Sequence, residues 1–212
     1  MNSIFKIIPL ENPVLQEYKD KAIKELNEFF NQKWVYNTPK LFVVDDRKSY
    51  NLLVGRETEA WEVGNSLDGN VGVCILSPEN ISKESSHTDS SYDVEKLIKH
   101  ELGHCWFRMT FGRQSKFSWV NEGVSVYVAG QLDRYSMPKE FRGFLEGVNL
   151  YQESGSAVKL LIDIFGKPTL FEFLKKQSGI EKAEELNVVF EDIFKAKLDY
   201  SFFNGLKDKS SN

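Results

Sequence analysis

Two of the three histidines in the chain, His100 and His104, lie four residues apart in the segment LIKHELGHCWF, residues 97–107. A helix turns about 100° per residue, so positions four apart face the same side and both imidazoles can point at one ion. Glu101 follows the first histidine, where an acid lies close enough to take a proton from a water molecule at the metal. The spacing is that of an HExxH metal helix.

The apolar pattern of this segment places Glu101 in an unusual position. On a helix, the apolar side chains form one broad arc, with His100 and His104 together at its edge and Glu101 inside it. A lone carboxylate is costly to bury unless a partner or a function holds it. The alternative is an ordinary amphipathic helix whose two histidines serve packing or lie at the surface.

A catalytic zinc site uses three protein ligands and leaves the fourth position to water. His87, in the polar loop KESSHTDSS (83–91), is one candidate for the third ligand. Glu122 is the better candidate, because it follows His104 by eighteen residues in the segment FSWVNEGVSVYVAG (117–130).

Together, HELGH and WVNEG resemble the gluzincin metallopeptidases, whose third ligand is a distant Glu in a W-x-x-E-G context. The resemblance covers roughly residues 70–178 and is closest to the compact peptidase-MA-like and M1-like catalytic domains. It implies one Zn²⁺ per chain held by His100, His104 and Glu122, with Glu101 as the general base. It also implies a helix over 123–128, where the alternating valines of GVSVYV alone favour a strand.

A second segment, LYQESGSAVKLLIDIFGK (150–167), resembles the part of the M1-like enzymes that holds a tyrosine. In that family the tyrosine donates a hydrogen bond to the oxyanion, which implies this role for Tyr151. The alternative is a tyrosine that begins a helix at an interface. The strand GVCILSP (72–78) lacks the acid with which M1 aminopeptidases hold the substrate amine. Its exposed edge, Val71 to Ser77, would still pair an extended peptide.

The leading functional prediction is zinc-dependent hydrolysis of peptide bonds in a peptide or protein substrate. Two alternatives stay open: a catalytically idle zincin scaffold that acts as a binding or regulatory module, and a sensor protease with a single protein partner. Retention of Glu101 argues against the idle scaffold, because a structural metal site needs no base.

Composition limits the other classes of function. The chain has 212 residues, 41% of them hydrophobic, and a net charge of −4. It has no basic block for nucleic acid and no apolar run near the ~20 residues that span a bilayer. We read no signal peptide and expect a cytoplasmic protein, with Cys74 and Cys105 as buried free thiols. The oligomeric state is left open.

The expected fold class is α+β and zincin-like, with a small mixed sheet, an HExxH active-site helix and a helical C-terminal part. We expect a single domain with subdomains 1–116 and 117–212. A capping box at Ser90 and Asp93 predicts that the active-site helix begins there and runs to about Met109. The other predicted elements are a helix at 13–32, strands at 39–46 and 70–78, a short helix followed by an irregular or extended stretch in 47–69, and helices at 137–148, 151–165, 168–177 and 181–197.

Overall fold

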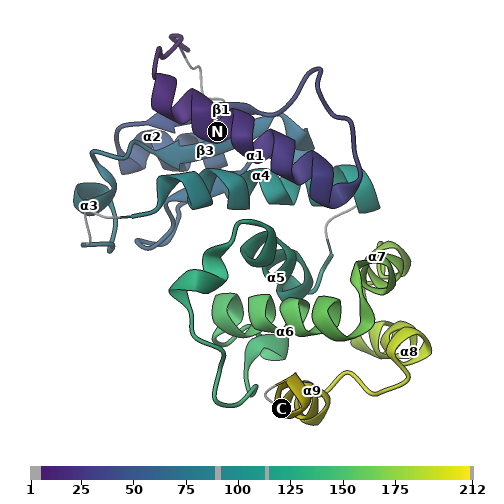
Figure 1. Cartoon of the computed structure of the whole chain (residues 1–212). Coiled ribbons are helices and arrows are strands. Elements are labelled where there is room, and N and C mark those ends of the chain that lie inside the picture. The colour runs from purple at the N-terminus through teal and green to yellow at the C-terminus, as the bar shows by residue number, and fades with distance from the viewer. Residues whose placement is uncertain (1–5, 89–91, 113–114, 211–212) are drawn as a thin grey trace. The chain divides into compact units, whose positions relative to one another are not determined.

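The computed structural model describes residues 6–88, 92–112 and 115–210, and its fold is α+β, as predicted (Figure 1). The chain forms two compact units, Met1–Trp106 and Phe107–Asn212, and the boundary between them falls inside one helix, α4. The first unit carries the sheet and the second is helical.

The first unit contains a three-stranded mixed sheet in the order β1-β3-β2. Strand β3 is central, parallel to β1 and antiparallel to β2. The helices around the sheet are α1, α2, the single turn α3, and α4. Their bounds, with those of the strands, are α1 Pro13–Phe30, β1 Lys40–Val44, α2 Arg47–Val54, β2 Gly64–Ser66, β3 Gly72–Leu76, α3 Ile81–Glu84 and α4 Val94–Phe111.

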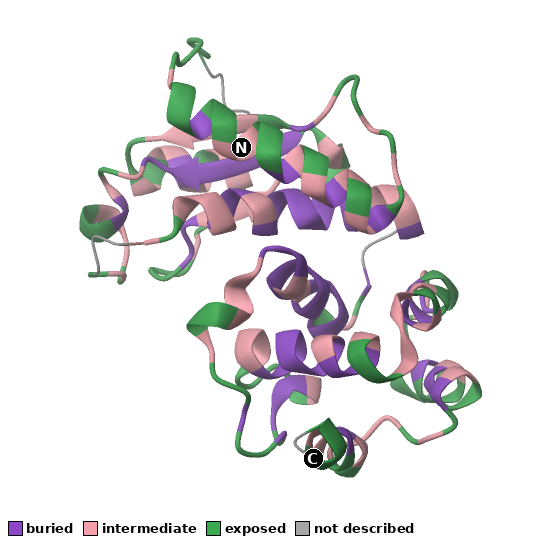
Figure 2. Cartoon of the chain, in the orientation of Figure 1, coloured by how far each residue is buried: buried purple, intermediate pink, exposed green. Residues whose placement is uncertain are grey.

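The central place of β3 corrects one expectation. All five residues of β3 are buried (Figure 2), and its backbone pairs with a strand on each side. The segment from Val71 to Ser77 therefore offers no free edge to a peptide. The edges of the sheet belong to β1 and to β2, a strand that the sequence did not reveal because its three residues, Gly-Asn-Ser, are poor strand formers.

The part of helix α4 that belongs to the first unit contacts α1. The Trp106 indole donates a hydrogen bond of 3.0 Å to Asn27, and Lys21 pairs with Glu95 at 2.6 Å. The Asp93 carboxylate, directly before α4, accepts a hydrogen bond of 3.0 Å from the backbone N–H of Lys96, which is the geometry of an N-cap. The helix thus begins after Asp93, while Ser90, the other half of the predicted capping box, lies outside the described residues.

The second unit packs helices around an aromatic core. Trp119 and the fully buried Phe144, Phe173, Phe190 and Phe203 form a network of edge-to-face and stacked rings. Helix α5 packs along α6. The α-helices of this unit are α5 Ser118–Val128, α6 Leu150–Phe165, α7 Lys167–Lys176, α8 Ala183–Phe194 and α9 Tyr200–Ser210.

The predicted helix over 137–148 is wrong. That stretch is irregular apart from one 3-10 turn, Phe144–Glu146. Gly147 has a φ of +83° and ends this turn in the left-handed region. The backbone N–H groups of Arg142, Gly143 and Phe144 donate to the Glu153 carboxylate on α6 at 2.9–3.2 Å. A tertiary partner has replaced the helical hydrogen bonds. Helix α9 was not predicted at all.

Candidate metal centre

Helix α4 presents its two histidines as the spacing predicts. His100 and His104 are both 5% exposed, and their ring centroids lie 4.9 Å apart. Leu97, Leu102 and Trp106 are buried on the same helix and anchor it in the first unit. Burial on one helix restricts both rings, which is what a ligand pair requires.

Glu101 is 7% exposed, so its carboxylate is a buried acid. Its negative charge is felt by two neighbours in the first unit. Burial and then the charge of Glu101 raise the pKa of the Tyr50 hydroxyl, and the same two causes raise the pKa of the Cys74 thiol to about 12. Both groups therefore stay protonated and neutral near neutral pH.

Helix α5 carries Glu122, and the residues around it explain why the WVNEG segment folds as it does. Asn121 accepts a hydrogen bond from the backbone N–H of Ser115 and donates one to its carbonyl, at 3.0 and 2.6 Å. A β-carbon built at Gly123 would lie 2.7 Å from the Ser154 carbonyl oxygen of α6, so only glycine permits this approach of the two helices. Trp119 packs in the aromatic core. Glu122 is half-buried.

Residues 123–128 are helical, as the resemblance implies, although their β-propensity alone favours a strand. Ser118–Val128 is an α-helix in which Val124, Val126 and Val128 are all buried. Propensity is a weak prior, and packing against α6 overrides it. The helical expectation is confirmed.

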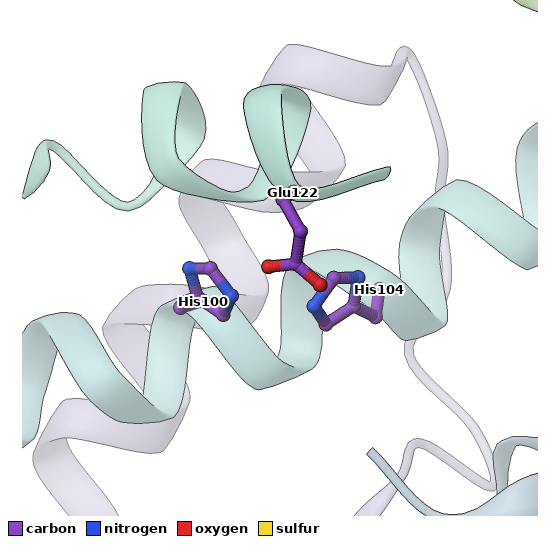
Figure 3. Close-up of side chains that lie close together, drawn as sticks. All are labelled: His100, His104 and Glu122. Atoms are coloured by element: carbon purple, nitrogen blue, oxygen red, sulfur yellow. The ribbon is translucent and has the colours of Figure 1, made fainter. Parts of the chain in front are cut away.

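His100, His104 and Glu122 form a group whose ligand atoms lie within 4.8 Å of one another (Figure 3). Within the residues that the structure describes, it is the one group of three such side chains close enough to hold a metal ion. The donor set is two imidazole nitrogens and one carboxylate oxygen, which suits zinc.

His87 does not belong to this group. Its Nε2 atom lies 2.8 Å from the Trp61 carbonyl oxygen, and its ring packs edge-on against Tyr92 at 4.8 Å. These contacts give the imidazole a local structural role in the loop before α4.

Tyr151 lies in the first turn of α6 and is half-buried. Gly123 of α5 packs closely against α6. Glu122 on α5 and Tyr151 on α6 therefore belong to one pair of packed helices. The role of Tyr151 as an oxyanion donor remains a prediction.

The sequence did not predict two residues beside Glu101, which are Tyr50 on α2 and Gly64 on β2. The Tyr50 side chain is fully buried, and its hydroxyl has no hydrogen-bond partner among the described residues. Neither residue belongs to a motif. Their proximity to Glu101 follows only from the packing of segments that are 37 to 51 residues apart in the chain.

Comparison of the chain with protein-family models, with curated proteins and with solved structures finds no match. None of the described helices combines the length and the apolar character needed to cross a membrane.

Proposed function

We propose that this protein is a zinc-dependent peptidase of the gluzincin type, in which His100, His104 and Glu122 hold the ion and Glu101 is the general base. The observation that carries the proposal is the grouping of these three ligands, with a buried carboxylate next to the first of them in the chain. When bound, a zinc ion at this site supplies a Lewis acid that acidifies water and polarises a carbonyl group.

Glu101 is the residue that moves protons in this proposal. Its carboxylate accepts a proton from the attacking water and passes it to the leaving amine of the cleaved peptide bond. Glu101 is buried, so its carboxylate is shielded from bulk water. In the same proposal, the Tyr151 hydroxyl donates a hydrogen bond to the oxyanion that forms from the carbonyl.

Burial of Glu101 also favours catalysis over an idle zincin scaffold. A buried carboxylate costs free energy, and a site that only binds metal gains nothing from it. A protease with a single protein partner remains the second candidate, because it would need the same four residues.

The ligand assignment is tested by elemental analysis of the purified protein. The wild type should contain one zinc per chain, and His100→Ala, His104→Ala and Glu122→Ala should each lose it. His87→Ala is the matched control and should keep one zinc per chain, because the His87 imidazole contacts the Trp61 carbonyl oxygen and not the proposed site. Full zinc content in any of the three ligand variants, or loss in the control, would contradict the assignment.

The catalytic role is tested by Glu101→Gln. The amide cannot accept a proton, so this variant should retain zinc while its turnover of casein-like substrates falls at least ~10²-fold. Unchanged turnover would show that Glu101 is not the base.

The same variant separates the alternatives. Because it should bind without cleaving, tagged Glu101→Gln can capture a protein partner from a lysate. Cleavage of that captured protein by the wild type, without cleavage of casein, would indicate a single-partner protease. Capture without cleavage would indicate a binding module.

A further inference from the structure

Gly64 opens strand β2 and pairs with Ile75 of β3. Glycine weakens a strand, because it has no side chain to pack and loses more conformational freedom on folding. Its backbone is not in the left-handed region, in contrast to Gly55 and Gly69 of the same unit, so no special conformation requires glycine here. The reason for this residue must be space.

The space at Gly64 is filled by side chains of α4. A β-carbon built there would lie 2.7 Å from Leu97 Cδ1, 2.9 Å from Glu101 Oε1 and 3.0 Å from Glu101 Cγ. Such distances are too short for carbon, so a methyl group at this position must displace these side chains. Two of the three atoms belong to the carboxylate side chain that follows His100.

Gly72 shows how different this case is from an ordinary structural glycine. A β-carbon at Gly72 would lie 2.4 Å from the backbone carbonyl oxygen of Lys40, in the neighbouring strand β1. A side chain there must push strands apart. The three atoms nearest to a β-carbon at Gly64 belong instead to two side chains of α4, so these side chains, and not a strand backbone, must shift.

We infer that Gly64 is a positioning residue for Glu101: the missing side chain on β2 leaves the space in which the Glu101 carboxylate is held. The inference rests on the proposed function for its catalytic consequence, but the packing relation stands by itself. Tyr50 and Cys74, whose pKa values the charge of Glu101 helps to raise, are both fully buried. A shift of about 1 Å in a reacting group can lower a rate roughly 10²-fold.

The first test is Gly64→Ala, with Gly205→Ala as the matched control. Gly205 lies in α9, and a β-carbon there meets nothing within 4 Å. Gly64→Ala should keep one zinc per chain, while kcat for casein-derived peptides falls about 10- to 100-fold with KM nearly unchanged. Gly205→Ala should match the wild type. Loss of zinc in Gly64→Ala would overturn the inference, since the substitution would then disturb α4 as a whole.

The second test needs no activity and uses a double-mutant cycle of urea unfolding. Relative to the wild type, Gly64→Ala should raise the equilibrium constant for unfolding. In a Glu101→Ala background, the same substitution should raise this constant by a factor that is smaller by roughly twofold or more, because two of the three close contacts are absent. Equal effects in both backgrounds would overturn the inference. If Gly64→Ala does not fold by itself, recovery of folding in the Glu101→Ala background supports the inference and continued failure refutes it.

The two tests keep the inference separate from the proposed function. If the wild type cleaves no peptide, the peptidase proposal fails, while the unfolding cycle still decides whether Gly64 positions Glu101. If the wild type is active and the cycle shows no coupling, Gly64 has no positioning role and the peptidase proposal stands.

Discussion

At the scale of single residues, the Tyr151 hydroxyl is the proposed donor to the oxyanion. Its ring is half-buried in the first turn of α6. A hydrogen bond from this hydroxyl to an oxyanion would exist only when the carbonyl carbon becomes tetrahedral. Such an interaction raises kcat without changing the binding of the substrate.

Tyr151→Phe removes only that hydroxyl. We expect zinc content and folding to survive, while kcat and kcat/KM fall together by roughly 10²–10³, the usual effect of removing one oxyanion donor. Steady-state kinetics on a peptide substrate measure this. Tyr36→Phe is the control, because Tyr36 is largely exposed in the other compact unit. Full activity in Tyr151→Phe would leave Tyr151 as a packing residue only.

At the scale of elements, the buried Glu153 decides the course of the chain before α6. Its carboxylate accepts three backbone N–H groups and also the Asn149 side-chain amide at 3.1 Å. Glu153, which lies after the segment 141–149 in the sequence, therefore holds three of its backbone donors, while Asn204 and Tyr200 of α9 bind the backbone of Phe141 and Leu145.

Glu153→Gln should destabilise the second unit. The amide keeps one acceptor oxygen and places an NH₂ group against backbone donors, so several charge-assisted hydrogen bonds are lost. We expect the free energy of unfolding to fall by about 2–4 kcal/mol, from typical costs of such bonds. Urea unfolding measures it. Glu172→Gln, in an exposed pair with Lys176, should change it by less than about 0.5 kcal/mol. An equal small effect of both would show that 141–149 is held by its aromatic packing instead.

At the scale of the whole molecule, acid should weaken the fold through capping and buried carboxylates in both units. Hydrogen bonds from Ser49 lower the pKa of Asp46, and the backbone N–H of Phe202 lowers that of Asp199. Burial raises the pKa of Glu62, but hydrogen bonds from Arg56 and the Glu59 backbone outweigh it, and the net pKa is lowered.

A carboxyl whose pKa is lowered by folding stabilises the fold above its unfolded pKa, near 3.8 for Asp and 4.5 for Glu. That stability is lost as the pH falls through the lower, folded value. The contribution of these carboxyls to the free energy of unfolding should be constant from about pH 7 to 5 and then decrease, which urea unfolding with a chelator present measures. The variant Asp46→Asn/Asp199→Asn should show a shallower decrease. A fold more stable at pH 3 than at pH 6 would contradict this.

Some of the molecule was determined by the sequence alone. The HExxH spacing, the position of Glu101 inside an apolar arc, strands β1 and β3 and helix α1 all follow from local patterns. The structure has α1, β1, β3, α4, α6, α7 and α8 close to where the patterns predict them. These elements could be predicted because the apolar pattern of a helix or strand repeats within a few residues of the sequence.

Tertiary structure alone decided the rest. Strand β2 exists because its backbone pairs with β3, although its residues favour no strand. The segment 137–148 is irregular because Glu153 takes its backbone donors, and 123–128 is helical because Gly123 lets α5 approach α6. Glycine is needed at position 64 because the side chain of Glu101, 37 residues later, fills the space beside it. Each of these depends on contacts between segments far apart in the chain, and such contacts leave no periodic signal in the sequence itself.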